Sequence, residues 1–173
     1  MLRLLVSIVM LSFGAMSGSA NASQIAVEYQ QGEYSTYGVR VAVQPMQAQP
    51  LPWWGLYWYP EVSISQWQQH QSDTASGKIN VVALSPVLRK PIRELGAGTL
   101  SVEFGIGASM LDEREIGSKH LGTYFQFEDR IGLHWSFSPR HSIALRYMHY
   151  SNGGLGRTNP GMDFINLSYA RAF

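Results

Sequence analysis

The sequence predicts an all-β fold, an eight-stranded antiparallel transmembrane β-barrel with a lipid-facing apolar exterior and a polar interior. Three observations favour it. Apolar residues recur at every second position in eight successive segments, and these apolar rows are too bulky to fill the interior of a small barrel. The chain also starts with an export-type leader and ends in Phe173. Nothing in the 173 residues indicates a second folded domain.

The leader is a basic residue followed by an apolar run. Arg3 precedes Leu4 to Met10, and small residues then lead to Ala20-Asn21-Ala22, a small-x-small cleavage pattern. We predict cleavage after Ala22, so that residues 1–22 are a signal peptide and residues 23–173 form the barrel domain. A transmembrane anchor is the alternative, but the run is shorter than the ~20 residues that span a bilayer.

The strands are predicted from a two-residue period, which is typical of a β-strand with one apolar face. In the clearest segment, Leu100, Val102 and Phe104 alternate with polar or small residues, whereas the fourth segment is less regular and contains Pro86. No stretch after Ser23 keeps a helical period. The eight segments cover residues 25–30, 37–44, 54–64, 78–88, 99–110, 125–135, 143–148 and 164–173.

Side-chain size decides which face lines the interior. The apolar rows consist mainly of Trp, Phe, Tyr, Leu and Ile, and an eight-stranded barrel has little interior volume. The opposite rows combine small residues with four acids and three bases that can pair inside the lumen. These are Glu28, Arg40, Glu61, Glu103, Glu128, Arg130 and Arg146. We therefore expect the apolar rows to face lipid; a soluble, lipocalin-like binding barrel is the alternative.

The chain end predicts location and direction. Phe173 after an alternating strand resembles the outer-membrane assembly signal of Gram-negative bacteria, so we expect an integral protein of the bacterial outer membrane. With both termini in the periplasm, loops near residues 31–36, 66–77, 111–120 and 152–162 lie outside the cell, and the turn at 138–140 lies inside. The tryptophans fit interfacial belts: Trp53, Trp54, Trp58, Trp67 and Trp135.

Composition excludes several classes of function. A net charge of +1 argues against a nucleic-acid partner, and the absence of cysteine removes disulfides, thiolate metal sites and cysteine nucleophiles. His70 and His120 fall in predicted outer loops without metal-ligand spacing, so we expect no metal site. His134 falls on the luminal face, where we expect it to join the internal polar network.

The most unusual stretch is RYMHYSNGGLGRTNPGMDF, residues 146–164. His149 and Ser151 continue the lipid-facing row of their strand, and Asp163 shares the outward parity of the last strand. Three polar groups therefore gather on the outer wall near the outer-leaflet head groups. Polar groups there are costly unless they are paired or used.

These residue types are the components of an acyl-transfer site. Positions i and i+2 on a strand lie about 6.5–7 Å apart, so an imidazole that leans along the strand can reach the serine oxygen. A neutral histidine can accept the serine proton, and a carboxylate on its other nitrogen fixes the tautomer. Asn152 and Gly154 can offer donors to an oxyanion. The alternative is that His149 and Ser151 belong to a polar girdle and that Asp163 only starts a strand.

The run His149-Tyr150-Ser151-Asn152, a glycine-containing loop and the run from Asn159 to Asp163 resemble the lipid A 3-O-deacylase (PagL) family. The resemblance implies an outer-membrane barrel that hydrolyses the ester at the 3-position of lipid A and releases a 3-hydroxy fatty acid. It also implies that His149 is the general base, Ser151 the nucleophile and Asp163 the acid. Asn152 and Gly154 would form the oxyanion hole. The family usually has glutamate where this chain has Asp163, whose side chain is one methylene shorter.

The resemblance implies lipid A of lipopolysaccharide as the substrate, without metal or organic cofactor, its acyl chains lying beside Leu145 and Tyr147. Basic residues on or near the outer loops can contact its phosphates: Lys78, Arg114, Lys119 and Arg157. A homodimer is left open. Two other functions also stay open, a non-enzymatic barrel for adhesion or membrane integrity and a phospholipase that uses the same triad.

Overall fold

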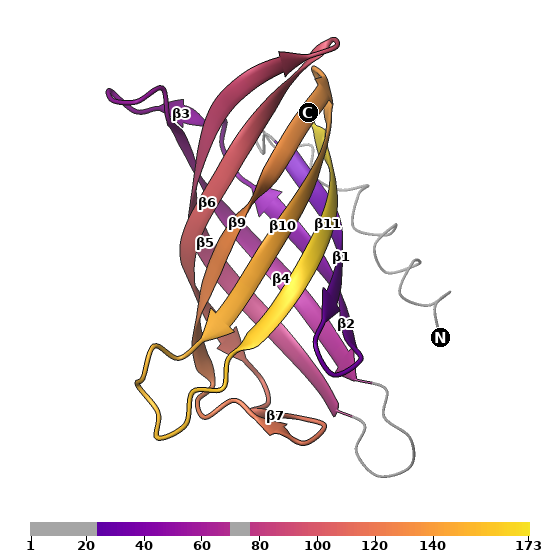
Figure 1. Cartoon of the computed structure of the whole chain (residues 1–173), viewed down its shortest axis with the longest axis vertical. Coiled ribbons are helices and arrows are strands. Elements are labelled where there is room, and N and C mark those ends of the chain that lie inside the picture. The colour runs from indigo at the N-terminus through magenta and orange to yellow at the C-terminus, as the bar shows by residue number, and fades with distance from the viewer. Residues whose placement is uncertain (1–23, 70–76) are drawn as a thin grey trace.

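The computed structural model describes residues 24–69 and 77–173, which form the predicted closed, all-β antiparallel barrel (Figure 1). Each long strand pairs with the next, and the first pairs with the last, which closes the wall. The eight wall strands are β1 (Gln24–Gly32), β2 (Thr36–Gln44), β4 (Tyr57–Gln69), β5 (Gly77–Leu95), β6 (Gly98–Leu111), β9 (Phe125–Ser138), β10 (His141–Ser151) and β11 (Met162–Ala172).

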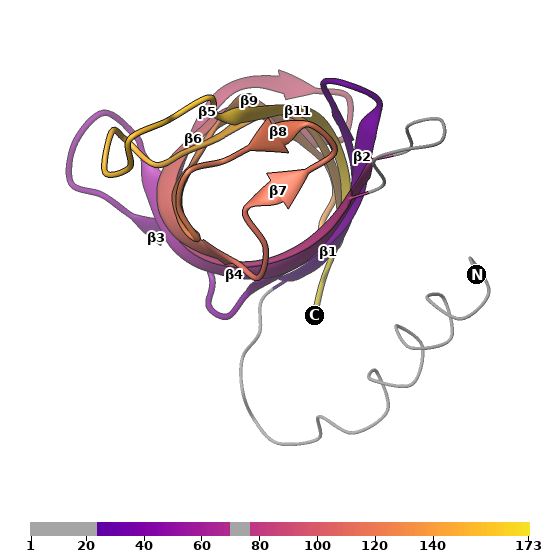
Figure 2. The same cartoon turned by 90° about the horizontal axis from the view of Figure 1, so that it is seen from below.

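The two ends of the barrel differ. At one end, which we call the long-loop end, residues 112–124 and 152–161 form long connections and residues 33–35 a short one (Figure 1). The other, the short-turn end, has short turns at residues 96–97 and 139–140 and one longer connection, residues 45–56. The short strands β7 (Glu115–Ile116) and β8 (Lys119–His120) form a hairpin across the mouth at the long-loop end (Figure 2). At the short-turn end, β3 (Gln49–Pro50) pairs with β4.

One strand begins later than predicted, and two predictions fall on residues that the structure does not describe. The predicted signal peptide and His70 lie outside the described residues. No helix among the described residues is long and apolar enough to cross a membrane. The third strand begins at Tyr57 rather than Trp54, because Trp54 and Gly55 have positive φ values of 61° and 63° that turn the chain out of the extended conformation.

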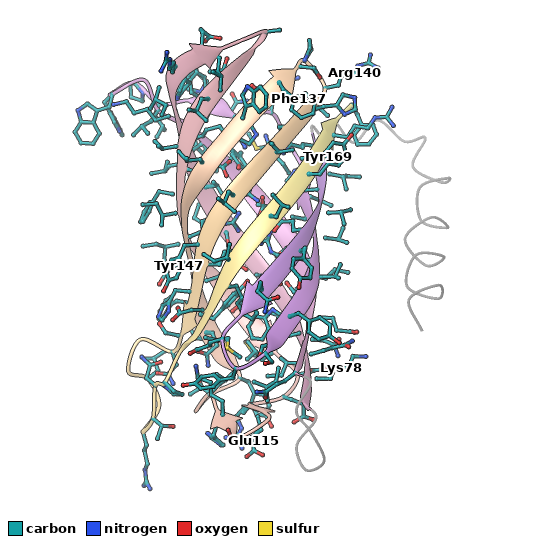
Figure 3. The ribbon with its side chains drawn as sticks, turned by 45° about the vertical axis from the view of Figure 1, so that its right-hand side comes forward. Lys78, Glu115, Phe137, Arg140, Tyr147 and Tyr169 are labelled. Carbon is teal, nitrogen blue, oxygen red and sulfur yellow. The ribbon has the colours of Figure 1, made fainter. Side chains whose placement is uncertain are left out.

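The outer wall is apolar along its whole circumference, as predicted. Ile131 and Leu145, for example, leave 60% and 54% of their surface exposed. Aromatic side chains lie toward both ends: Figure 3 shows Phe137 and Tyr169 near the short-turn end and Tyr147 on the half nearer the long loops. An apolar band between two aromatic girdles is typical of a barrel that spans a lipid bilayer.

The middle of the lumen holds a buried network of ion pairs. Arg40 contacts Glu28, Glu61 and Glu128 at 2.9, 2.7 and 3.1 Å. Each of the seven charged residues that the alternation placed inside is buried and paired, as predicted. Arg89 also joins, through Glu103 at 2.6 Å. His134 is inside as expected, but neither of its ring nitrogens has a hydrogen-bond partner among the described residues.

Toward the long-loop end the lumen also holds a cluster of apolar side chains beside buried polar ones such as Gln30, a feature that alternation alone did not predict. The β7–β8 hairpin places Ile116 in this cluster. Trp67 also lies here, fully buried with its Nε1 donating to Gln30, and not in an interfacial belt. It shares the inward parity of Glu61, so strand geometry overrides the preference of tryptophan for interfaces. The cluster consists of Trp67, Ile79, Val81, Leu111, Ile116, Leu121, Met148, Tyr150, Met162 and Phe164.

The loop between β10 and β11 is tied down by one buried side chain. The Asn152 Nδ2 donates to the carbonyl oxygens of Thr158 (2.8 Å) and Leu121 (3.3 Å), and its Oδ1 accepts from the Gly154 N–H at 3.0 Å. The Asn152 N–H donates to Asn159 Oδ1 at 2.8 Å. This loop is therefore fixed both to itself and to the loop that covers the mouth.

We predict that Glu128→Gln lowers the free energy of unfolding by about 3 kcal/mol, because it leaves the buried Arg40 and Arg130 with one carboxylate fewer. Urea unfolding of the refolded barrel, followed by heat-modifiable migration, measures the change. Glu113→Gln, on an exposed loop, is the control and should leave stability unaltered. Equal stability of the two variants would contradict the structural role of the network.

We also predict that Asn152→Ala raises tryptic cleavage after Arg157 at least about tenfold, because the buried carbonyl partners of Asn152 lose their donor and the loop opens more often. The measurement is the rate at which the fragment beginning at Thr158 appears. Leu155→Ala, an exposed change in the same loop, is the control. Unchanged cleavage in Asn152→Ala would show that other contacts hold the loop.

Candidate active site

The side chains of β10 point alternately into the lumen and toward the outer wall. Met148 and Tyr150 point inward into the apolar cluster, whereas Tyr147, His149 and Ser151 point outward. The Tyr150 ring packs edge-on against Trp67, with 4.7 Å between ring centroids, and its hydroxyl donates to Glu128 Oε2 at 2.9 Å. The inner face of the strand is therefore anchored directly behind the outward-facing polar residues.

His149 and Asp163 are brought into direct contact by the register of the last two strands. They lie opposite each other in the β10–β11 pair, and His149 Nδ1 is 2.6 Å from Asp163 Oδ1. The Tyr147 hydroxyl donates to the same oxygen at 2.7 Å. If Nδ1 carries the proton that Asp163 accepts, Nε2 is the acceptor nitrogen. An aspartate thus spans the gap to His149, although its side chain is short.

Ser151 lies two residues beyond His149 on the same outer face and is half-buried. Among the described residues its hydroxyl makes no side-chain hydrogen bond, so the structure places Ser151 beside the His149–Asp163 pair without a bond to the ring. In unliganded hydrolases such bonds are often long and tighten only when substrate binds. The serine hydroxyl is thus left available.

The two oxyanion candidates have their donors bonded to groups of the protein. Asn152 is fully buried, and its side-chain donor is bonded to Thr158 and Leu121 carbonyl oxygens. The Gly154 N–H is bonded to Asn152 Oδ1. Both donors are engaged within the loop in this conformation, and their assignment stays a prediction.

One acidic residue near the site was not assigned a role from the sequence. Asp129 on β9 lies opposite His149 in the β9–β10 register and is half-buried on the outer wall. His149 therefore sits between two strands that each present a carboxylate, and its bond is to Asp163. The signal was present in the sequence, because Asp129 interrupts an otherwise apolar lipid-facing row.

The basic residues of the long-loop end fall into two groups. Lys119 forms an ion pair with Glu33, and Arg114 lies over the ring of Tyr124, 4.9 Å from its centroid. Lys78 and Arg157 are exposed and have no ion pair within the described part of the chain. Over the same ranges, no group of three or more His, Asp or Glu side chains is arranged to hold a metal ion.

A shallow apolar groove runs along the outer wall on the short-turn side of the site. Its volume is about 140 Å³, and its lining includes Leu133, Ile143, Leu145 and Leu167. Ile143 and Leu145 belong to the outward row of β10 that continues to His149. The site therefore lies at the end of an apolar track on the lipid-facing surface.

Comparisons with known proteins show which family the chain resembles. The model of the family "Lipid A 3-O-deacylase (PagL)" matches residues 35–172. Lipid A deacylase PagL of Bordetella bronchiseptica is 34% identical over 70% of this chain, and that of Pseudomonas aeruginosa is 30% identical over 65%. The matched segments span 65% and 62% of these relatives' own lengths, less than two thirds of each.

A crystal structure of the outer membrane enzyme PagL has the same fold. It superposes with a TM-score of 0.74 at 23% identity and covers 86% of this chain and 98% of its own. The family match extends over most of the chain and includes β10, β11 and the polar residues on their outer face. The chain belongs to the lipid A 3-O-deacylase (PagL) family.

Proposed function

We propose that this protein is an outer-membrane serine esterase that hydrolyses the ester at the 3-position of lipid A and releases a 3-hydroxy fatty acid. The observation that carries the proposal is the 2.6 Å contact between His149 Nδ1 and Asp163 Oδ1 on the lipid-facing wall, next to Ser151 on the same row. Membership of the deacylase family supports the choice of substrate. We also propose that residues 1–22 direct export and are removed.

In the first half-reaction, Ser151 Oγ attacks the ester carbonyl while His149 Nε2 accepts the hydroxyl proton. Asp163 holds the ring through Nδ1 and stabilises the imidazolium that forms. The tetrahedral intermediate collapses, the bond between the acyl carbon and the sugar oxygen breaks, and the imidazolium protonates that oxygen. The products are lipid A with a free 3-hydroxyl and a 3-hydroxyacyl ester on Ser151.

In the second half-reaction, water attacks the acyl-enzyme with His149 again acting as the base. The imidazolium then returns the proton to Ser151 Oγ, and the free fatty acid leaves. For Asn152 or Gly154 to stabilise the oxyanion, its donor must exchange its bond within the loop for a bond to the intermediate.

The substrate reaches this site from the side, within the membrane. With the long-loop end outside the cell, Ser151 lies near the head groups of the outer leaflet, and acyl chains lie along the wall toward Leu145 and Ile143. The exposed Lys78 and Arg157 can contact lipid A phosphates. No enclosed pocket is needed, because the substrate is already oriented by the bilayer.

We predict that Ser151→Ala abolishes release of 3-hydroxy fatty acid while the barrel stays heat-modifiable, because the change removes the nucleophile and no side-chain bond of the fold. Mass spectrometry of lipid A from cells with and without the protein measures the loss of one ester-linked hydroxyacyl chain. Activity retained by Ser151→Ala would exclude it as the nucleophile. Cleavage of phospholipid vesicles without lipid A would identify a phospholipase instead, and wild type inactive on both would indicate a non-enzymatic barrel.

We further predict that Asp163→Asn lowers kcat by about 10²- to 10⁴-fold, since the amide no longer stabilises the imidazolium and can reverse the ring tautomer. Asp129→Asn is the matched control on the opposite side of His149 and should lower kcat by less than about tenfold, because Asp163 already holds Nδ1. Steady-state kinetics on purified lipid A decide the point. A larger loss in Asp129→Asn would transfer the role of the acid to Asp129.

A further inference from the structure

Gly161, the residue just before β11, lies against the ring of His149. A Cβ built on Gly161 would be 2.7 Å from His149 Cε1 and 3.5 Å from its Nε2. Cε1 lies between the two ring nitrogens, so the edge of the ring that carries both faces the position of the missing Cβ. A separation of 2.7 Å is closer than real Cβ atoms approach, so any side chain at this position would displace the ring.

The space for the ring matters because the site is on an open wall. The side chain of His149 leaves 36% of its surface exposed. Asp163 fixes the ring at Nδ1, but one hydrogen bond leaves the ring free to tilt about that contact. The missing Cβ at Gly161 leaves room for Cε1, so the ring can take the orientation in which Asp163 holds Nδ1.

We propose that Gly161 is a positioning residue that sets the orientation of the His149 imidazole for proton transfer from Ser151. The proposal rests on the proposed function, because it requires His149 to act as the base. The proposed role is distinct from the backbone conformation that the turn requires. The φ of +65° explains why a glycine suits the backbone here, but it does not explain why the ring occupies the space of the missing Cβ.

The chain contains a matched control for the backbone effect. Gly96, in the β5–β6 turn at the short-turn end, has a φ of +64°, and a Cβ there would meet nothing within 4 Å. Gly96→Ala therefore carries the same conformational strain as Gly161→Ala without a contact to any side chain. A Cβ at Gly161 would also lie 3.2 Å from the Tyr150 carbonyl oxygen, so a difference between the two variants reports this contact together with the space taken from the ring, and a background without the ring separates the two.

The first experiment measures kcat and KM on lipid A per folded molecule, with heat-modifiable migration giving the folded fraction. We expect Gly161→Ala to lower kcat about 10- to 100-fold with KM changed less than about threefold, because a sub-ångström shift of the base misaligns proton transfer. Phosphonylation of Ser151 by a fluorophosphonate should slow in parallel. Gly96→Ala should match wild type. Equal kcat in the two alanine variants would overturn the proposal.

A second experiment does not depend on activity and covers the case in which Gly161→Ala folds poorly. We expect Gly161→Ala to lower the urea midpoint more than Gly96→Ala does, and we expect most of this excess to disappear when His149→Ala is added to both, since only the contact with the Tyr150 carbonyl oxygen then remains. An excess of unchanged size without the ring would overturn the proposal.

The outcomes separate the two proposals. Wild-type protein that releases no 3-hydroxy fatty acid contradicts the proposed function and, with it, the role of Gly161 in that reaction. Active wild type together with an unimpaired Gly161→Ala contradicts only the positioning role. Slow chemistry in Gly161→Ala combined with rescue of its stability by His149→Ala supports both.

Discussion

The alternation of side chains across a single strand is the constraint on which the candidate site depends. Met148 and Tyr150 are locked inside the barrel, so His149 between them must face outward in one orientation. Tyr150 in turn bonds to Glu128, which holds Arg40 and Arg130. The ion-pair network thus supports the outer wall from inside the barrel. In a barrel with a water-filled lumen the same strand would lack this support, and a site on its outer face would be less well ordered.

A site on a convex wall has no pocket, so the substrate and the reacting side chains must be positioned by other means. Enzymes usually enclose the substrate and restrict its motion by many contacts. Here the bilayer already holds lipid molecules at one depth and with one orientation, so part of that restriction is supplied before binding. The groups proposed for catalysis still have to be held, and the contacts available are short-range. The Asp163 carboxylate is bonded to Nδ1, the Tyr147 hydroxyl is bonded to that carboxylate, and Gly161 leaves space for the ring.

The sequence predicted those features that follow from a period of two. The strands, the outward parity of His149 and the inward pairing of residues such as Arg40 and Glu61 all depend only on alternation. Trp67 was misplaced because residue type was preferred over its parity, and the apolar cluster was missed because it gathers inward residues from many strands with loop residues such as Ile116. The opposition of Asp129 and Asp163 across His149 depends on strand register, which alternation does not specify.

The outer row of β10 also bears on whether the polar cluster serves the fold or a reaction. Closer to the middle of the wall this row holds Ile143 and Leu145, and apolar residues at 149 and 151 would pack against lipid equally well. A histidine–aspartate pair by itself does not require a reaction to explain it, because its two members satisfy each other and charged groups near the interface cost only about 0–1 kcal/mol. Such a pair needs neither a neighbouring serine whose hydroxyl has no side-chain partner in the described part of the chain nor a glycine that leaves room for the ring. Ser151 and Gly161 supply those two features on either side of His149, and they fit the requirements of an acyl-transfer base better than those of a structural contact.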